Sequence, residues 1–171
     1  MDRAQLRSVQ EPLKERYRAD PDAALVTLRA SGTLGDGVSC KVDTGRALAE
    51  AGLHPASGGD GSLLCSGDML LEALAACAGV TLRAVATSLR LDVQGTVDAE
   101  GDLDFRGTLG VDRDAPVGFR AIRLRFALET DADDDELATL LRLTERYCVV
   151  LQTLASAPDL SVALDRRQAS L

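Results

Sequence analysis

Hydrophobic positions are densest near the middle of the chain, over residues 67–89. Nearly every side of this stretch is apolar when it is drawn as a helix, and Arg83 is the first charged residue after Glu72. A helix that is apolar all round is a buried helix. Ser66 and Asp68 stand at its start, where side-chain oxygens cap free backbone N–H groups and an acid favours the helix dipole. The pattern therefore predicts a buried helix at the centre of the domain.

Shorter stretches of alternating apolar and polar residues predict strands. They lie at residues 25–28, 38–42, 91–99, 103–111, 122–128 and 160–164. We expect a glycine-rich turn at residues 32–37 between the first two, and a hairpin turn at residues 100–102 between the third and fourth. The strand over 122–128 has one solvated face, because arginines alternate with its apolar residues. A polar loop without helix or strand pattern covers residues 52–62.

Two further helices complete the expected order. Residues 4–17 predict a polar helix, and residues 133–154 predict a second amphipathic helix that carries Cys148 on its apolar stripe. The order of strands, buried helix, strands, helix and strand is typical of an α+β domain. We expect residues 1–20 to form a helical extension and residues 21–171 to form one domain, which suits a chain of 171 residues.

Composition narrows the function classes. The chain is 46% hydrophobic and 27% charged, with no apolar leader at its start and no apolar run of about 18 residues, so a soluble cytoplasmic protein is expected. Its net charge of −8 repels phosphate backbones and anionic lipid, and its aromatic content is 3%. Nucleic acid and membrane are therefore not expected as partners.

Candidate chemistry is concentrated in the cysteines. The chain has four cysteines, Cys40, Cys65, Cys77 and Cys148, and no two of them have the C-x-x-C spacing. It also has only one histidine, so neither zinc nor another metal cofactor is expected. In a reducing compartment these residues are free thiols. A free cysteine in an apolar helix is most often a packing residue, and Cys40 and Cys65 keep that interpretation.

Cys77 and Cys148 have an alternative role as a reactive pair. A thiolate, unlike a thiol, is a good nucleophile; a peroxide oxidises it to a sulfenic acid, which condenses with a second thiol to a disulfide. A nearby cation or a helix N-terminus lowers the pKa of such a thiol. Arg83, Arg142 and Arg146 are the candidate cations.

Three other features have structural explanations that compete with functional ones. Glu72 is expected to form a structural ion pair rather than to act in catalysis, because a buried glutamate needs a partner. His54 is a conceivable general base, but its flanks favour a solvated loop. The acidic run at residues 131–136 lacks the glycine and distal glutamate of a calcium loop, so it is interpreted as a helix N-terminus.

The segments around Cys77 and Cys148 resemble two motifs of the OsmC-like family. The first is Cys65-Ser66-Gly67-Asp68-Met69-Leu70-Leu71-Glu72-Ala73-Leu74-Ala75-Ala76-Cys77, similar to the family's x-Glu-Leu-Leu followed by small residues and Ala-Cys. The second is Tyr147-Cys148-Val149-Val150-Leu151-Gln152-Thr153-Leu154, similar to Cys-Pro-Val-x-x-Thr-Leu. Residues 58–61, 107–111 and 116–122 also match the family's pattern, so the resemblance covers residues 25–165.

This resemblance implies an intertwined α+β homodimer, with antiparallel sheets around the buried helix and two active sites at the subunit interface. In such proteins the first cysteine attacks a hydroperoxide, the second resolves it, and a dithiol restores both, with no metal or haem. Cys77 and Cys148 would carry these roles here. The resemblance thus implies a thiol-dependent peroxidase that reduces organic hydroperoxides or hydrogen peroxide.

The helper residues depart from the family pattern. The organic-hydroperoxide-resistance branch has a glutamate where this chain has Gly67, and its arginine is missing from the turn at residues 32–37. The OsmC-like branch has a glutamate at the position of Asp68 and a proline at that of Ser66. The chain therefore resembles the general OsmC-like branch, with Asp68 as a candidate helper. The alternative is a non-catalytic protein of this fold that binds a small apolar ligand or senses redox state.

Overall fold

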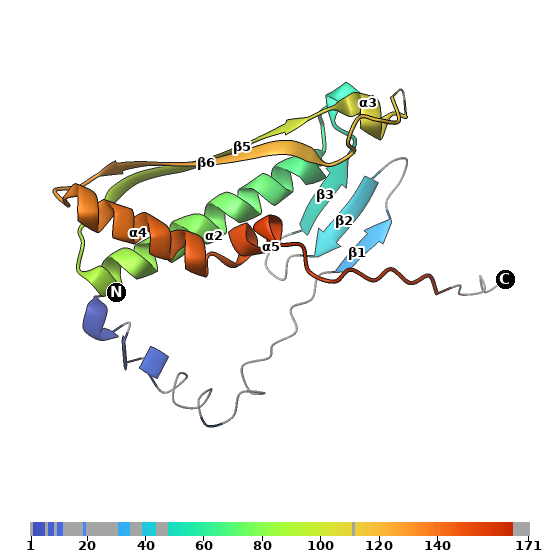
Figure 1. Cartoon of the computed structure of the whole chain (residues 1–171). Helices are drawn as coiled ribbons and strands as arrows, with labels where there is room; N and C mark the ends of the chain where they lie inside the picture. Colours follow the sequence, from blue (N-terminus) through green and yellow to red (C-terminus); the bar gives the residue numbers. More distant parts are fainter. Residues whose placement is uncertain are drawn as a thin grey trace.

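The computed structural model describes residues 2–5, 7–8, 10–11, 19, 31–34, 39–43, 48–110 and 112–165 of the chain. Its elements are β1 (Ser31–Leu34), β2 (Ser39–Asp43), β3 (Leu48–Gly52), the 3-10 turn η2 (Pro55–Ser57), β4 (Leu64–Cys65), α2 (Ser66–Leu89), β5 (Gln94–Leu103), α3 (Phe105–Thr108), β6 (Phe119–Glu129), α4 (Asp134–Tyr147) and α5 (Val149–Ala155). The mixed order confirms the expected α+β class (Figure 1). Residues 3–5, 7–8 and 10–11 are helical, as predicted for this region.

A four-stranded sheet precedes the long helix, with strand order β1-β2-β3-β4. Its first two pairs are antiparallel, whereas β3 and β4 pair in parallel. β2 confirms the strand predicted over residues 38–42. The strand predicted over residues 25–28 lies outside the described residues. β1 occupies part of the segment predicted as a glycine-rich turn, and β3 was not predicted at all, so both are corrections.

β5 and β6 form one long antiparallel hairpin (Figure 1). The turn predicted at residues 100–102 is wrong, because Glu100 and Asp102 lie inside β5, opposite residues of β6. Gly101 lies between them, where an added Cβ would come within 2.4 Å of the Phe119 ring. The glycine therefore serves close packing and does not make a turn. Residues 103–111, predicted as a strand, contain α3 instead, which begins after the capping side chain of Asp104.

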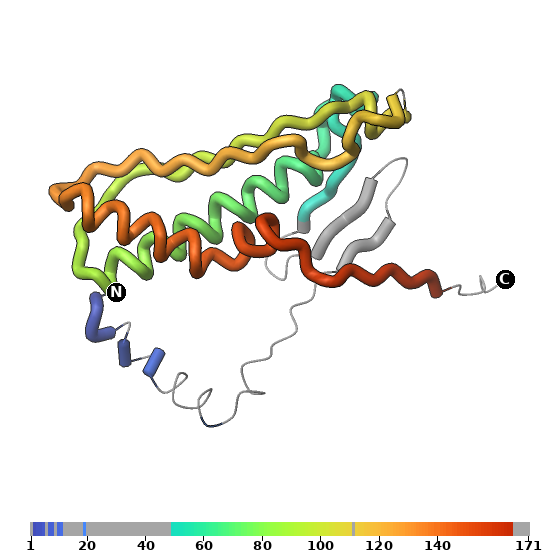
Figure 2. Tube along the Cα trace, viewed as in Figure 1, coloured from blue at the N-terminus to red at the C-terminus, as the bar shows by residue number. Residues whose placement is uncertain are grey.

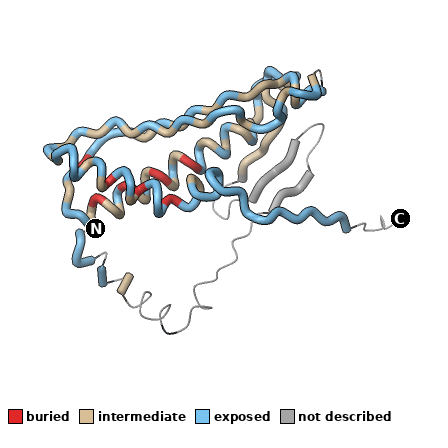
Figure 3. Tube along the Cα trace, viewed as in Figure 1, coloured by how far each residue is buried: buried red, intermediate tan, exposed pale blue. Residues whose placement is uncertain are grey.

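α2 confirms the predicted long helix, but its burial differs from the prediction. Four residues at a spacing of four are buried, namely Leu74, Ala78, Leu82 and Ala86. Leu82 and Ala86 join Val93 and Leu140 in the hydrophobic core between α2, the hairpin and α4. Among the described residues, no element covers the opposite side of α2, along which exposed residues recur (Figure 3). Val80 on that side is 72% exposed.

The first turn of α2 differs from the one that the sequence predicts. Cys65, not Ser66, occupies the N-cap position, and it makes no side-chain cap bond; Asp68 lies in the first turn. Over the described ranges, α2 is the one helix long and apolar enough to cross a membrane, a property that it shares with the core helices of soluble proteins.

The helix predicted over residues 133–154 is interrupted. Asp133 and Glu136 form a capping box at the start of α4, which confirms the interpretation of the acidic run as a helix start. Cys148 then adopts an extended conformation, with φ −74° and ψ 106°, and separates α4 from α5. The predicted strand over residues 160–164 is wrong for the single chain, because this segment lies outside every sheet and extends away from the body (Figure 2).

Candidate active site

The structure brings Cys77 and Cys148 together. Cys77 lies halfway along α2 and is half-buried, whereas Cys148 is completely buried at the break between α4 and α5. Both α4 and α5 pack against α2, which places this break beside the middle of that helix. The two thiols act on each other: a hydrogen bond with Cys148 lowers the pKa of Cys77, and Cys77 raises the pKa of Cys148.

Hydrogen bonds lower the pKa of the Cys77 thiol. Burial alone would raise this pKa, because it disfavours the charged thiolate. The opposing contributions are larger together: the backbone N–H groups of Val150 and Val149 and the Cys148 thiol all donate to the Cys77 sulfur. Among the described residues, no charged side chain contributes to this shift. The acidification of Cys77 therefore comes from the Cys148 thiol and the first residues of α5 rather than from an arginine.

Burial raises the pKa of Cys148, and its contact with Cys77 raises that pKa further. A thiolate at Cys77 repels a second negative charge and accepts the Cys148 proton in a hydrogen bond, so the neighbour stays protonated. The two cysteines are thus unequal. Cys77 is partly exposed and has a lowered pKa, which suits a nucleophile that attacks a substrate. Cys148 is buried and stays protonated, which suits a thiol that reacts only after Cys77 has been oxidised.

Gln152 joins α5 to the end of α4. Its side-chain amide donates to the carbonyl oxygen of Glu145 at 2.8 Å, and its backbone N–H donates to Cys148 at 2.9 Å. A carbonyl in the last turn of a helix otherwise lacks an intrahelical donor, so the first contact satisfies an unpaired group. These bonds fix the orientation of the amides that face Cys77.

The predicted helper residues do not reach Cys77 within one chain. Asp68 is exposed and lies nine residues earlier on α2, about 13.5 Å along the helix axis. Arg83 donates to the carbonyl of Val93, and Arg146 lies over the ring of Tyr147, at 5.6 Å from its centroid. Glu72 was expected to be buried in an ion pair, but its side chain is exposed.

His54 has a local structural role. Its Nδ1 accepts the backbone N–H of Ala56 at 3.0 Å and so caps η2, and its ring stacks on Phe105 with centroids 5.0 Å apart. The residue is in a loop, as predicted, but it is half-buried rather than fully solvated. Among the residues that the structure describes, no group of three or more metal-ligating side chains could hold an ion.

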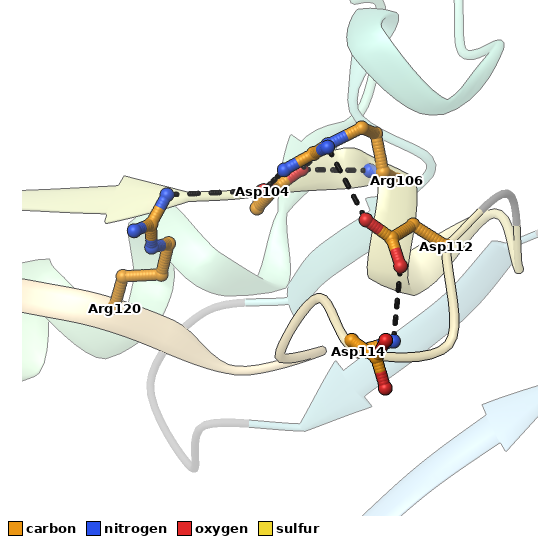
Figure 4. Close-up of polar contacts among 5 residues, drawn as sticks. All are labelled: Asp104, Arg106, Asp112, Asp114 and Arg120. Atoms are coloured by element: carbon orange, nitrogen blue, oxygen red, sulfur yellow. Dashed lines mark hydrogen bonds and ion pairs between the residues drawn. The ribbon is translucent and has the colours of Figure 1, made fainter.

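An ion-pair network near α3 was not predicted from the sequence. Asp104 receives two hydrogen bonds from the Arg106 guanidinium, at 3.0 and 2.6 Å, and lies 3.8 Å from Arg120 (Figure 4). The Arg106 side chain lowers the pKa of Asp104 to about 2. Arg106 also pairs with Asp112 at 3.2 Å. Both arginines of the network are paired with acids. These ion pairs connect α3 to the loop that follows it and to the start of β6, so they hold the connection between β5 and β6 in place.

An apolar cavity is lined by residues that lie one helical turn from each of the two cysteines. It has a volume of about 340 Å³ and lies between α2, β6 and α5. Leu74, one turn before Cys77, and Leu151, one turn after Cys148, form part of its wall, and Arg120 lies at its edge. The cavity can therefore receive an apolar group one helical turn from each cysteine along its helix.

Several solved structures of other proteins are similar to the structure of this chain. An OsmC-like protein from Mycoplasma pneumoniae is 17% identical, with a TM-score of 0.64 over 77% of this chain and 89% of its own. The organic hydroperoxide resistance protein OhrB of Bacillus subtilis is 18% identical, with a TM-score of 0.52 over 78% and 94%. An organic hydroperoxide resistance protein OsmC from Legionella pneumophila is 20% identical, with a TM-score of 0.53 over 77% and 90%.

At these identities the likeness shows the fold alone. No curated protein sequence matches this chain. The family model of the OsmC-like proteins, however, matches residues 59–163, which include both cysteines and most of the described elements. The chain therefore belongs to the OsmC-like family.

Proposed function

We propose that this protein is a cysteine-dependent peroxidase that reduces organic hydroperoxides or hydrogen peroxide with an external dithiol. The observation that carries the proposal is the contact between two thiols whose pKa values shift in opposite directions. Hydroperoxide resistance proteins of the same fold support it. The proposed cellular role is defence against oxidative stress, in the cytoplasm.

The proposed reaction begins at Cys77. Its thiolate attacks the terminal oxygen of the hydroperoxide; an S–O bond forms, the O–O bond breaks, and the leaving alkoxide takes up a proton to become an alcohol. The thiol of Cys77 is thereby oxidised to a sulfenic acid. Loss of the Cys77 thiolate removes the negative charge that keeps Cys148 protonated. Cys148 then attacks the sulfenic sulfur, a disulfide forms, water leaves, and two electrons from the dithiol restore both thiols.

We also propose that the protein acts as a homodimer. Exposed apolar side chains support this: Val80 is 72% exposed on α2, and Leu160, Val162 and Leu164 are 85%, 100% and 93% exposed in the extended C-terminal segment. Asp68, exposed on α2 and remote from the thiol of its own chain, would act on a partner's Cys77 or not at all. Light scattering coupled to gel filtration tests the assembly, and we expect Val80→Glu to yield monomers where the wild type gives dimers.

The test of the enzyme proposal measures consumption of cumene hydroperoxide with dihydrolipoamide or dithiothreitol as reductant. We expect turnover by the wild type, none by Cys77→Ser, and normal turnover by Cys65→Ser, the matched control. Peptide mapping after peroxide treatment should find a Cys77–Cys148 disulfide in the wild type and a Cys77 sulfenic acid in Cys148→Ser. No turnover by the wild type, or full turnover by Cys77→Ser, would refute the proposal.

The apolar cavity favours a second candidate function. A protein of this fold that binds a small apolar ligand, without catalysis, would use the same 340 Å³ space beside Leu74 and Leu151. In that case the cysteines would serve packing or redox sensing. The peroxidase assay separates the two functions, because a binding protein shows no turnover and no dependence on Cys77.

A further inference from the structure

The uncovered side of α2 has an apolar centre with one charge at each end. Ala73, Ala76 and Val80 form the centre and are all exposed (Figure 3). Their spacing of three and four residues keeps them on one side of the helix. Glu72 precedes this centre and Arg83 follows it, and both are exposed on the same side. These five residues are named the α2 face below.

Within the described part of the chain, the two charges of the α2 face have no ion-pair partner. Neither Glu72 nor Arg83 takes part in any of the ion pairs there. Eleven residues separate them, so they lie about 20° apart around α2 but about 16.5 Å apart along its axis, too far for contact. Arg83 donates one hydrogen bond to the carbonyl of Val93, which leaves most of its five N–H donors for an acid.

The α2 face is complementary to itself when two copies run antiparallel. A two-fold axis perpendicular to α2 at its midpoint, between Cys77 and Ala78, brings each residue opposite the one equally far beyond the midpoint in the other copy. Glu72 lies five residues before Cys77, and Arg83 lies five residues after Ala78. The axis therefore places Glu72 beside Arg83 of the partner subunit, at both ends of the contact. A parallel arrangement would place each charge beside its like.

The centre of the α2 face has side chains of the size that such a contact needs. Ala73 and Ala76 are small, so a second helix can approach closely, and Val80 of the partner subunit would lie near Ala76 and fill the space above it. The axes of packed helices are about 8–10 Å apart, a separation that glutamate and arginine side chains together span. Burial of the apolar centre supplies affinity because it removes exposed apolar surface from water.

We propose that α2 of two copies of this chain pack antiparallel through the α2 face, with two reciprocal Glu72–Arg83 ion pairs that set direction and register. The inference rests on the homodimer proposed above and specifies how its subunits meet. An exposed ion pair contributes little affinity, whereas like charges brought together at an interface are strongly unfavourable. The charges thus select the antiparallel arrangement against the parallel one.

The experiment exchanges the charges and measures the dimer dissociation constant of the full chain by analytical ultracentrifugation at low ionic strength. Glu72→Arg and Arg83→Glu each bring like charges together at both ends of the contact. An equimolar mixture of the two variants restores two opposite-charge pairs in the heterodimer, and the double variant restores them in its own homodimer. Arg142→Glu and Glu145→Arg make the same changes at exposed positions of α4 and are the matched controls.

Thermal unfolding of each variant checks the fold. If Arg83→Glu does not fold, comparison of Glu72→Arg with Glu72→Gln still tests the pairing. Both substitutions remove the attraction, but only Glu72→Arg adds repulsion, so it should weaken the dimer more than Glu72→Gln does.

We expect each single reversal to raise the dissociation constant by at least about tenfold, because two attractive contacts in each dimer become repulsive. The mixture and the double variant should return close to the wild-type value, and native mass spectrometry should detect the heterodimer. Unchanged dissociation constants in the single variants, or a mixture no tighter than either variant alone, would overturn the antiparallel pairing. A monomeric wild type would refute the homodimer itself and this arrangement with it, whereas the peroxidase assay tests the enzyme independently.

Discussion

Replacement of Val149 by proline isolates the contribution of one backbone amide to the reactive thiol. Val149 is the first residue of α5, a position where proline fits well because its N–H is not needed within the helix. The preceding residue must avoid the α region, and Cys148 does so with a ψ of 106°. The Val149 side chain is 69% exposed, so its loss removes little packing. The substitution therefore deletes a donor to Cys77 and leaves the fold intact.

The size of the effect follows from the kind of bond removed. A hydrogen bond to a charged group contributes about 1.5–3 kcal/mol, and the half-buried position of Cys77 favours the lower end of this range. A change of about 1.4 kcal/mol is tenfold in an equilibrium constant. We therefore expect Val149→Pro to raise the pKa of Cys77 and to slow its alkylation, on the acid side of that pKa, by up to about tenfold.

The assay measures the rate at which iodoacetamide alkylates Cys77 in the full chain as a function of pH, with peptide-resolved mass spectrometry. Thermal unfolding of each variant checks the fold. Val149→Ala keeps the N–H group and is the matched control, for which the wild-type profile is expected. If Val149→Pro reacted like the wild type, or if Val149→Ala slowed alkylation equally, the backbone amide of Val149 would not be one of the groups that acidify Cys77. The resemblance gives this substitution added interest, because the family motif has proline at this position.

Two further predictions concern the hairpin and its loop. Arg106→Gln should raise the pKa of Asp104 from about 2 toward its ordinary value, as measured by carboxyl NMR titration. Because this pKa is lowered in the folded state, the contribution of Asp104 to stability is complete above about pH 4 and is lost as the pH falls through about 2 in the wild type. Gly101→Ala should destabilise the fold by about 1–3 kcal/mol, because its Cβ would lie 2.4 Å from the Phe119 ring. Gly118→Ala, whose Cβ would meet no atom within 4 Å, should melt like the wild type, and equal melting temperatures of the two variants would refute this packing argument.

The elements that could be predicted from the sequence are those whose pattern is decided locally. α2 follows from a long stretch that is apolar on nearly every side, β6 from alternating apolar and polar residues, and the start of α4 from acids that cap free N–H groups. The hairpin turn was misplaced because Glu100-Gly101-Asp102 has the composition of a turn. In the fold, the two acids face solvent and pair with Arg123, while the glycine makes room for an aromatic ring.

In the candidate site, too, local patterns were predicted from the sequence and features set by packing were not. The resemblance predicts that Cys77 and Cys148 act together, and this role stays a prediction. The sequence offered a cation or a helix N-terminus as the group that lowers the pKa of Cys77, but it named only arginines, whereas the structure assigns this effect to Cys148 and the first residues of α5. The break at Cys148 involves no glycine or proline, because it results from packing of the buried thiol against α2 rather than from local propensity. The one available signal was the proline that follows the second cysteine in the family motif, since proline favours the first position of a helix. That signal marks Cys148 as the boundary between two helices, and so marks the amides that follow it.

The position of Cys148 between two helices has a mechanical consequence. Two sulfurs in hydrogen-bond contact must still approach to about 2.05 Å to form a disulfide. Inside a continuous helix that approach would strain the hydrogen bonds on both sides of the cysteine. Here the backbone torsions of Cys148 belong to neither helix, so they can rotate while α4 and α5 each keep their own hydrogen bonds. Formation of the Cys77–Cys148 disulfide therefore requires only a rotation of the backbone at Cys148, and neither helix has to unwind.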